Sequence, residues 1–155
     1  MNKKLPILLE GNPILRIPCI PVRYIDRELM DLALSMCRTM VAAQGIGLSA
    51  PQIGKSIQLL VVDTIYSESN GTSAIMFNPE LLHGEGSVIN KEGCLSIPGK
   101  VVEIERFAKV KVKYKSIQNQ EIIREFVGLA AIAVQHEMDH LNGIILSDHA
   151  ALSEP

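Results

Sequence analysis

Two histidines four residues apart, His136 and His140, enclose a glutamate in the stretch Gln-His-Glu-Met-Asp-His. On an α-helix this spacing places both imidazoles on one face, one turn apart. Two imidazoles placed in this way can bind one metal ion, and Glu137 can then accept or donate a proton at a water on that ion. Paired histidines can also form a hydrogen-bonded pair in a protein core, so the motif by itself leaves both interpretations open.

A third metal ligand has to come from elsewhere in the chain, because a catalytic site usually has three protein ligands. Glutamate, aspartate, histidine or cysteine could supply it. Cys94 is the best candidate, since a thiolate binds such metals strongly and since Gly93 lets the backbone of the loop predicted here approach a ligand closely. Considered alone, however, Cys94 is better interpreted as a buried free thiol.

The stretch from residue 45 to residue 52, Gly-Ile-Gly-Leu-Ser-Ala-Pro-Gln, is the third with residues suited to chemistry. Its two glycines allow tight turns and close approach to the backbone of a substrate. It lacks the lysine and the hydroxyl residue of a phosphate-binding loop. Gln52 offers an amide N–H suited to a developing oxyanion. Considered alone, this stretch is better interpreted as a turn at the exit of a helix.

Two helices are expected to position these residues. The apolar run at 129–134 predicts a buried helix that carries both histidines, and Gly143 is suited to end it. Apolar residues recur with helical spacing from about Arg27 to about Ala43, behind Asp26 as a good N-cap, and predict the second helix. The proline-rich residues 5–24 predict an extended segment that wraps the fold.

Short apolar or alternating runs predict the strands. The run at 109–115 alternates lysine with apolar residues, which indicates one buried and one solvated face. Pro79 is expected to end the strand before it. Strands are predicted at 58–63, 74–78, 101–105, 109–115 and 121–127.

The order helix, antiparallel strands, helix indicates an α+β fold. We expect antiparallel sheets packed around a central metal-binding helix, with one further long helix toward the N-terminus. A length of 155 residues suits a single domain spanning 1–155.

Composition excludes several classes of function. A net charge of -2 and an aromatic content of 4%, with no tryptophan, argue against a nucleic-acid-binding surface. No apolar run approaches the roughly 20 residues that span a bilayer, and the N-terminal stretch is too short in apolar residues for a signal peptide. Three widely spaced cysteines do not form a disulfide framework. We therefore expect a cytoplasmic protein that has no membrane partner and no sequence-specific nucleic-acid partner.

The three chemical stretches, in this order, resemble the signature motifs of the peptide deformylase family. Residues 92–96 (Glu-Gly-Cys-Leu-Ser) and 135–140 match the family pattern without exception. Residues 45–52 depart from it only at Ser49, where the family usually has alanine. The resemblance extends from Leu5 to about Asp148. It implies a hydrolase of protein biosynthesis that removes the formyl group from N-formylmethionine at the N-terminus of newly made polypeptides, releasing formate during co-translational processing.

The resemblance also implies a ligand set and a metal. Cys94, His136 and His140 would bind one divalent ion, Fe(II) in the cell, while Zn, Ni or Co can occupy the same site. The ligand types by themselves would indicate zinc. Residues at family positions of the substrate-binding site are Ile46, Gly47, Gly93, Arg106, Leu129, Ile132 and Ala133.

Catalytic roles follow from the same resemblance. Glu137 would take a proton from the attacking water and pass one to the departing amine. The Gln52 side chain and the Leu95 backbone N–H would meet the oxyanion beside the metal. Asp139 is expected to stabilise the helix or support its neighbours, and not to bind the metal.

N-formylmethionyl peptides are the expected partner, and contact with the ribosome is expected to be weak. Many family members continue past the metal helix into a basic helix thought to dock on the ribosome. In this sequence no lysine or arginine follows Arg124. We therefore expect ribosome contact to be weak or to use another surface.

Two other functions compete with this interpretation. A metallopeptidase with the same histidine motif would take a further ligand downstream, where His149, Asp148 and Glu154 are the candidates. The position of Cys94 upstream, in a motif of its own, argues against it. A non-catalytic binding module is the other alternative, and intact Glu137 and Gln52 argue against it because binding alone needs neither.

Overall fold

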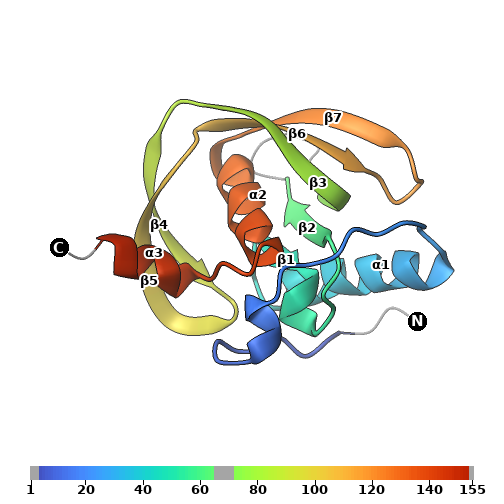
Figure 1. The fold of residues 1–155 in the computed structure, drawn as a ribbon, viewed down its shortest axis with the longest axis horizontal. Helices are drawn as coiled ribbons and strands as arrows, with labels where there is room; N and C mark the ends of the chain where they lie inside the picture. The colour runs from blue at the N-terminus through green and yellow to red at the C-terminus, as the bar shows by residue number, and fades with distance from the viewer. Residues whose placement is uncertain (1–3, 65–71, 154–155) are drawn as a thin grey trace.

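A central helix is surrounded by strands in the computed structural model, which describes residues 4–64 and 72–153 (Figure 1). This helix, α2, spans Gly128–Leu141 and is buried along most of its length. Helix α1 spans Arg27–Ala42, and a short helix α3 spans Leu146–Ser153. None of the helices in these described ranges has the length and apolar character needed to cross a membrane.

The strands form two antiparallel sheets. The larger sheet has the order β1-β2-β3-β6-β7, and the smaller sheet pairs β4 with β5. The bounds are β1 Gly47–Ser49, β2 Leu59–Asp63, β3 Ser73–Glu85, β4 Val88–Cys94, β5 Ile97–Arg106, β6 Lys109–Lys115 and β7 Glu121–Val127. Two 3-10 turns, η1 Pro13–Arg16 and η2 Ala50–Ile53, complete the described elements.

Strand β2 lies between the two long helices. Leu60 and Val62 join the apolar cluster that includes α2, whereas Leu59 and Val61 join the cluster that includes Met36 and other residues of α1. Because successive side chains of a strand point to opposite faces, both faces of β2 are covered. This explains why β2 reads as an uninterrupted apolar run, and it fixes α2 firmly on one face of the larger sheet.

Several predicted elements are confirmed, and so is the α+β class. Helix α1 begins at Arg27 as predicted, and Asp26 Oδ1 accepts a hydrogen bond from the Leu29 N–H at 2.9 Å as its N-cap. Strands β6 and β7 have the predicted bounds. In β6 the apolar residues Val110 and Val112 are fully buried while the lysines lie on the outer face. Gly143 follows α2 with a φ of 74°, as expected for a residue that ends a helix.

The prediction that Pro79 ends a strand is wrong, because β3 continues to Glu85. The register with β6 shifts between Phe77 and Glu80, so the proline sits at a bulge where no ladder donor is required. Asn78 has a φ of 52° there. Its side-chain amide forms two hydrogen bonds of 2.7 Å with the backbone of Val22, which stabilises the bulge and anchors the N-terminal segment.

The prediction that Cys94 lies in a loop is also wrong. Cys94 is the last residue of β4, and a two-residue turn leads into β5, which is longer than the predicted strand at 101–105. Sequence pattern did not reveal β4 because its buried residue is charged: Glu92 points inward and pairs with Arg106. The short elements β1 and α3 were not predicted either.

Candidate metal centre

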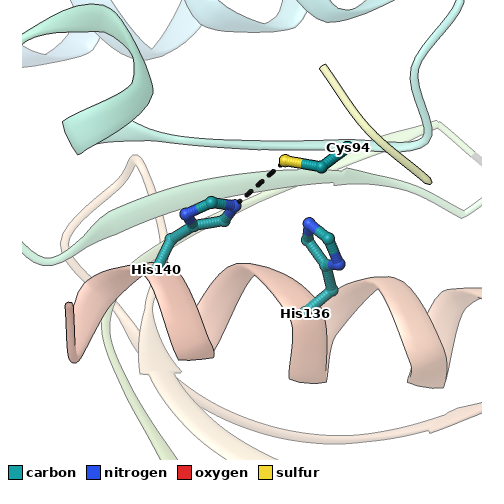
Figure 2. A group of neighbouring side chains, drawn as sticks. All are labelled: Cys94, His136 and His140. Carbon is teal, nitrogen blue, oxygen red and sulfur yellow. Dashed lines mark hydrogen bonds between the residues drawn. The ribbon is translucent and has the colours of Figure 1, made fainter. Parts of the chain in front are cut away.

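Three potential ligand atoms converge beside α2. Figure 2 shows both imidazoles projecting from the helix toward Cys94. The Cys94 Sγ lies 3.4 Å from His140 Nε2, and the ligand atoms of Cys94, His136 and His140 all lie within 4.8 Å of one another. A thiol and two imidazoles form a donor set suited to a divalent transition metal. The residues present therefore fit the metal that the motif implies.

The two histidines do not form the core pair that the sequence left open. Their ring centroids are 5.1 Å apart with planes inclined by 63°. Among the hydrogen bonds of the described residues, none joins the two rings; His140 Nε2 faces Cys94 Sγ, and His136 Nδ1 faces Glu92. The helix presents both rings to the end of β4, which is the arrangement that metal binding requires.

Glu92 and Arg106 hold the ring of His136 from behind. His136 Nδ1 donates a hydrogen bond to Glu92 Oε1 at 3.0 Å, which leaves Nε2 directed toward the ligand cluster. Arg106 binds both oxygens of Glu92, each at 2.8 Å, and its third nitrogen binds Asp139 Oδ2 at 2.7 Å. A hydrogen bond to the remote nitrogen fixes the tautomer and orientation of a ligating histidine.

The charges of this cluster set the protonation states of its groups in the metal-free protein. Burial would lower the pKa of His136, but hydrogen bonds with Cys94 and Glu92 raise it to about 10, so this ring carries a proton on Nε2 that a metal ion has to displace. Burial alone would raise the pKa of Glu92, but hydrogen bonds from Arg106 and His136 outweigh it and lower this pKa to about 2. Glu92 is therefore ionised and accepts from the imidazole N–H. Burial, together with the positive charges of His136 and Arg106, lowers the pKa of His140 to about 3, so this ring is neutral and keeps a lone pair for a metal.

Glu137 lies beside the ligand cluster with one oxygen free. Its Oε1 is 4.0 Å from His136 Nε2, and its Oε2 has no hydrogen-bond partner within the part of the chain that the structure describes. Burial raises the pKa of Glu137 to about 7, although the nearby His136 lowers it. A carboxyl group with a pKa near neutrality can both accept and release a proton at physiological pH.

Gln52 is fixed in one orientation by hydrogen bonds on both ends of its amide. Its Oε1 accepts from the Ser49 backbone N–H at 2.9 Å and from the Ser49 hydroxyl at 3.0 Å. Its Nε2 therefore points the other way, 3.1 Å from Ser96 Oγ and 3.6 Å from Cys94 Sγ. The amide N–H groups thus face the site, where they can meet negative charge.

A cavity of about 500 Å³ opens beside Glu137, between α2, the segment before β1 and the β4–β5 hairpin. Leu129, which the sequence placed at the start of a buried helix, is 41% exposed and lines this cavity. Six of the seven predicted substrate-binding residues line it, as does Leu95: Ile46, Gly47, Gly93, Leu129, Ile132 and Ala133.

The seventh predicted residue, Arg106, is buried behind the ligand cluster and is not among the residues that line the cavity. The downstream ligands of the competing metallopeptidase lie elsewhere as well. His149 binds Asp139 at 2.9 Å, and Asp148 binds Arg16 at 2.6 Å. Glu154 lies outside the described residues.

Sequence reasoning missed the roles of Glu92, Ser96 and Ser49. Glu92 stands two residues before Cys94 on the same strand, but the β4–β5 register shifts between them, so strand alternation alone does not relate their side chains. The contacts of Ser49 and Ser96 with Gln52 bring together residues from two motifs, and nothing in the spacing within either motif indicates them.

Comparisons with known proteins agree with this geometry. The family profile described as polypeptide deformylase matches residues 4–155. A peptide deformylase from Desulfotalea psychrophila is 40% identical over 146 residues, which cover 94% of this chain and 86% of that protein. The crystal structure of a peptide deformylase from Thermotoga maritima has a TM-score of 0.86 and 39% identity, covering 92% of this chain and 95% of its own. A Met-Ala-Ser-bound class I type b peptide deformylase from Acinetobacter baumannii has a TM-score of 0.86 and 34% identity, covering 96% and 99%.

Proposed function

The chain belongs to the polypeptide deformylase family, and from that premise we propose that the cavity beside α2 is its active site. The protein is a metal-dependent hydrolase that removes the formyl group from N-formylmethionine at the N-terminus of newly made polypeptides and releases formate. One observation carries the assignment of the site: three potential ligand atoms within 4.8 Å of one another lie beside a buried carboxylate that has a free oxygen.

Cys94, His136 and His140 hold one divalent ion in this proposal. Such an ion supplies a Lewis acid that activates water at neutral pH. The neutral ring of His140 has a free lone pair, and the Glu92 hydrogen bond at Nδ1 leaves Nε2 of His136 as the atom that loses its proton when an ion binds. We propose Fe(II) as the ion in the cell on the strength of the family resemblance, with Zn, Ni or Co able to take its place.

Glu137 moves the proton. Its free Oε2 takes a proton from the attacking water and then delivers it to the nitrogen of the departing methionine amine. The pKa of about 7, raised by burial, suits a group that has to accept the proton in one step and give it up in the next. Its place beside His136 keeps this transfer next to the reacting formyl carbon.

Gln52 and Leu95 stabilise the negative charge that develops on the formyl oxygen. The Gln52 Nε2 group is held toward the site by Ser49 on one side and Ser96 on the other. The Leu95 backbone N–H immediately follows Cys94 and supplies the second donor. Preorganised donors of this kind typically contribute about 10²–10³ in turnover each.

The peptide lies in the 500 Å³ cavity with its methionine side chain against the apolar residues of α2, Leu129, Ile132 and Ala133. Its backbone pairs with Ile46 and Gly47 on one side and with Gly93 on the other. Support comes from the Acinetobacter baumannii relative, whose structure contains Met-Ala-Ser. A tight site discriminates formyl from acetyl by one methyl group, worth about 1–3 kcal/mol.

The test is formate release from formyl-Met-Ala-Ser by the Ni(II)- or Fe(II)-loaded protein, compared with cleavage of internal peptide bonds. We expect Glu137→Ala to retain metal and to lose about 10³-fold or more in turnover, because only proton transfer is removed. Cys94→Ala should lose the metal itself. An active Glu137→Ala variant, or a Cys94→Ala variant that keeps full metal content, would contradict the assigned roles.

Metal content after anaerobic purification tests the identity of the ion. The Fe(II) form is expected to lose activity in air, since a thiolate-bound ferrous centre is oxidisable. Unchanged activity after hours of aeration would instead indicate Zn or Ni. Weak contact with the ribosome stays a prediction from the sequence, and co-sedimentation with ribosomes measures it.

A further inference from the structure

His149 of α3 makes a hydrogen bond that the proposed mechanism does not use. Its Nε2 donates to Asp139 Oδ2 at 2.9 Å, and the imidazole side chain is 25% exposed. From the sequence, His149 is a candidate metal ligand only in the competing metallopeptidase. It is absent from the group of residues that could hold a metal, and it is also absent from the cavity lining.

The Asp139 oxygen that His149 binds begins a series of hydrogen bonds that ends at His136, one of the three potential metal ligands. The same Asp139 Oδ2 accepts from Arg106 Nη1 at 2.7 Å. Arg106 binds both oxygens of Glu92, each at 2.8 Å, and Glu92 Oε1 accepts from His136 Nδ1 at 3.0 Å. An unbroken series of charged hydrogen bonds thus runs from the partly exposed surface of α3 to the ring of His136.

Helix α3 is attached to the strand that carries Arg106. Leu146 is 2% exposed and packs against Val102 and Ile104 of β5. Lys100 Nζ donates to Ser147 Oγ at 3.1 Å, at the other end of the same strand. His149 is therefore held at a fixed position relative to Arg106, as a group must be if it is to orient the carboxylate that both of them bind.

We propose that His149 is a positioning residue for the metal ligand His136, acting through Asp139, Arg106 and Glu92. The inference rests on the proposed function, because it takes His136 as a ligand. Asp139 is itself 25% exposed at its side chain, so without His149 the carboxylate can rotate toward water. Arg106 then loses its second anionic partner, and Glu92 and the imidazole that it orients become less firmly held.

The experiment compares the release of metal to EDTA from Ni(II)-loaded variants. His149→Phe keeps the ring shape and removes the N–H donor, whereas His149→Gln places an amide N–H near the position of Nε2. We expect His149→Phe to release metal about three- to tenfold faster, less than the 10–100-fold typical of a residue bonded directly to a ligand. His149→Gln should stay within about twofold of the wild type. The matched control is His83→Gln, since His83 pairs with Glu85 at 3.5 Å and is 66% exposed.

Two further measurements separate positioning from simple docking of α3. The Co(II) absorption spectrum should change in His149→Phe and not in His149→Gln, because it reports on the geometry of the ligands. In an Asp139→Ala background, His149→Phe should add nothing to the rate of metal release, because the group through which it acts is gone. If the double variant folds poorly, the Co(II) spectra of the two single variants at His149 still decide the question.

A His149→Phe variant with the wild-type release rate and Co(II) spectrum overturns the inference. So does an effect of equal size in the Asp139→Ala background, since it would assign His149 to the docking of α3 alone. Failure of the proposed function gives a different result: the wild-type protein itself would not retain Ni(II), or Cys94→Ala would retain it equally well, and the inference would fall with it.

Discussion

Ser49 stands where the deformylase family usually has alanine, and its hydroxyl is 3.0 Å from Gln52 Oε1. The Ser49 backbone N–H reaches the same oxygen at 2.9 Å. The single hydroxyl proton of Ser49 can turn instead toward Glu137, where it lowers the pKa of that carboxyl against the larger effect of burial. One side chain is therefore placed to influence both the proposed oxyanion donor and the proposed proton carrier.

Replacing the hydroxyl tests this dual contact. Ser49→Ala keeps the backbone donor, so we expect kcat to fall only about two- to fivefold with KM unchanged, the effect of one lost hydrogen bond. The pKa of Glu137 should rise, and the fall in kcat/KM on the acid side should begin at a higher pH, since catalysis needs the ionised form. Steady-state kinetics across pH 5–9 measure both effects.

The control for that substitution is Ser116→Ala. Ser116 is buried, and its hydroxyl accepts from the backbone of Gln118 and Gln120 in a turn between β6 and β7. It should affect stability without moving the pH profile. A Ser49→Ala profile that coincides with the wild-type profile would remove Ser49 from any role in orienting Gln52 or tuning Glu137.

Individual residues differed in how far the sequence identified them. His136, Glu137 and His140 were identified because helix geometry fixes their relation locally. Cys94 was the best candidate for a third ligand on thiolate chemistry alone, but no local rule connects residue 94 to residue 136, so only the family resemblance implied that the two act together. The partners of these residues, Glu92 and His149, could not be found in that way because they depend on strand pairing and on where α3 docks.

At the scale of elements, strand β1 passes so close to α2 that Gly47 has no room for a side chain. A Cβ atom built there would lie 2.8 Å from Glu137 Oε1 and 2.9 Å from its Cγ. At Gly45 the added atom would instead meet Leu95 Cδ1 at 2.8 Å, the end of a flexible side chain. The absence of a side chain at Gly47 therefore preserves the position of the Glu137 carboxylate, which we propose to be catalytic, whereas at Gly45 it makes room for a leucine side chain that can rotate.

Alanine at each glycine should separate these effects. We expect Gly47→Ala to lose about 10²-fold in kcat with metal content intact, because a displacement of about 1 Å at a reacting group has a cost of this size. Gly45→Ala should lose less, since the Leu95 side chain can turn away. Formate release and metal analysis on the two variants give the ranking, and a greater loss for Gly45→Ala would refute the argument.

Elements were predicted well where one periodicity ran through them and poorly where polar contacts interrupted it. Strand β6 alternates along its whole length, and its bounds were predicted correctly. Strand β4 buries an ion pair at Glu92 and Arg106, so its pattern resembles that of a loop. Strand β3 continues through Pro79 only because Asn78 bonds to Val22, a contact between distant segments that local sequence cannot reveal.

At the scale of the whole molecule, Glu92 joins the smaller sheet to the central helix. It lies on β4 and binds Arg106 of β5 and His136 of α2. Burial opposes ionisation, yet these two partners lower the pKa of Glu92 from 4.5 to about 2. A pKa lowered in the folded state contributes stability above the unfolded value, and that contribution is lost as the pH falls.

The metal-free protein should consequently lose stability as the pH falls from 4.5 to about 2. In this interval Glu92 is protonated in the unfolded chain but still ionised in the folded protein. Thermal unfolding at pH 6 and pH 3 measures the loss. Glu92→Gln should be destabilised at pH 6 and show a smaller further loss at pH 3. Glu121→Gln is the control, because Glu121 is 60% exposed and pairs with Lys113 on the surface. Equal pH dependence in both variants would disprove the assignment.

The position of α2 late in the sequence determines when the core can be completed during synthesis. The apolar cluster that unites β2, β3, β6 and β7 is completed by Ala130, Ala131, Ala133, Val134 and Leu141 of this helix. Because a chain is made from its N-terminus onward, the strands emerge from the ribosome before the surface on which they pack. The molecule that processes nascent chains is thus itself unable to close this core until translation has passed Leu141.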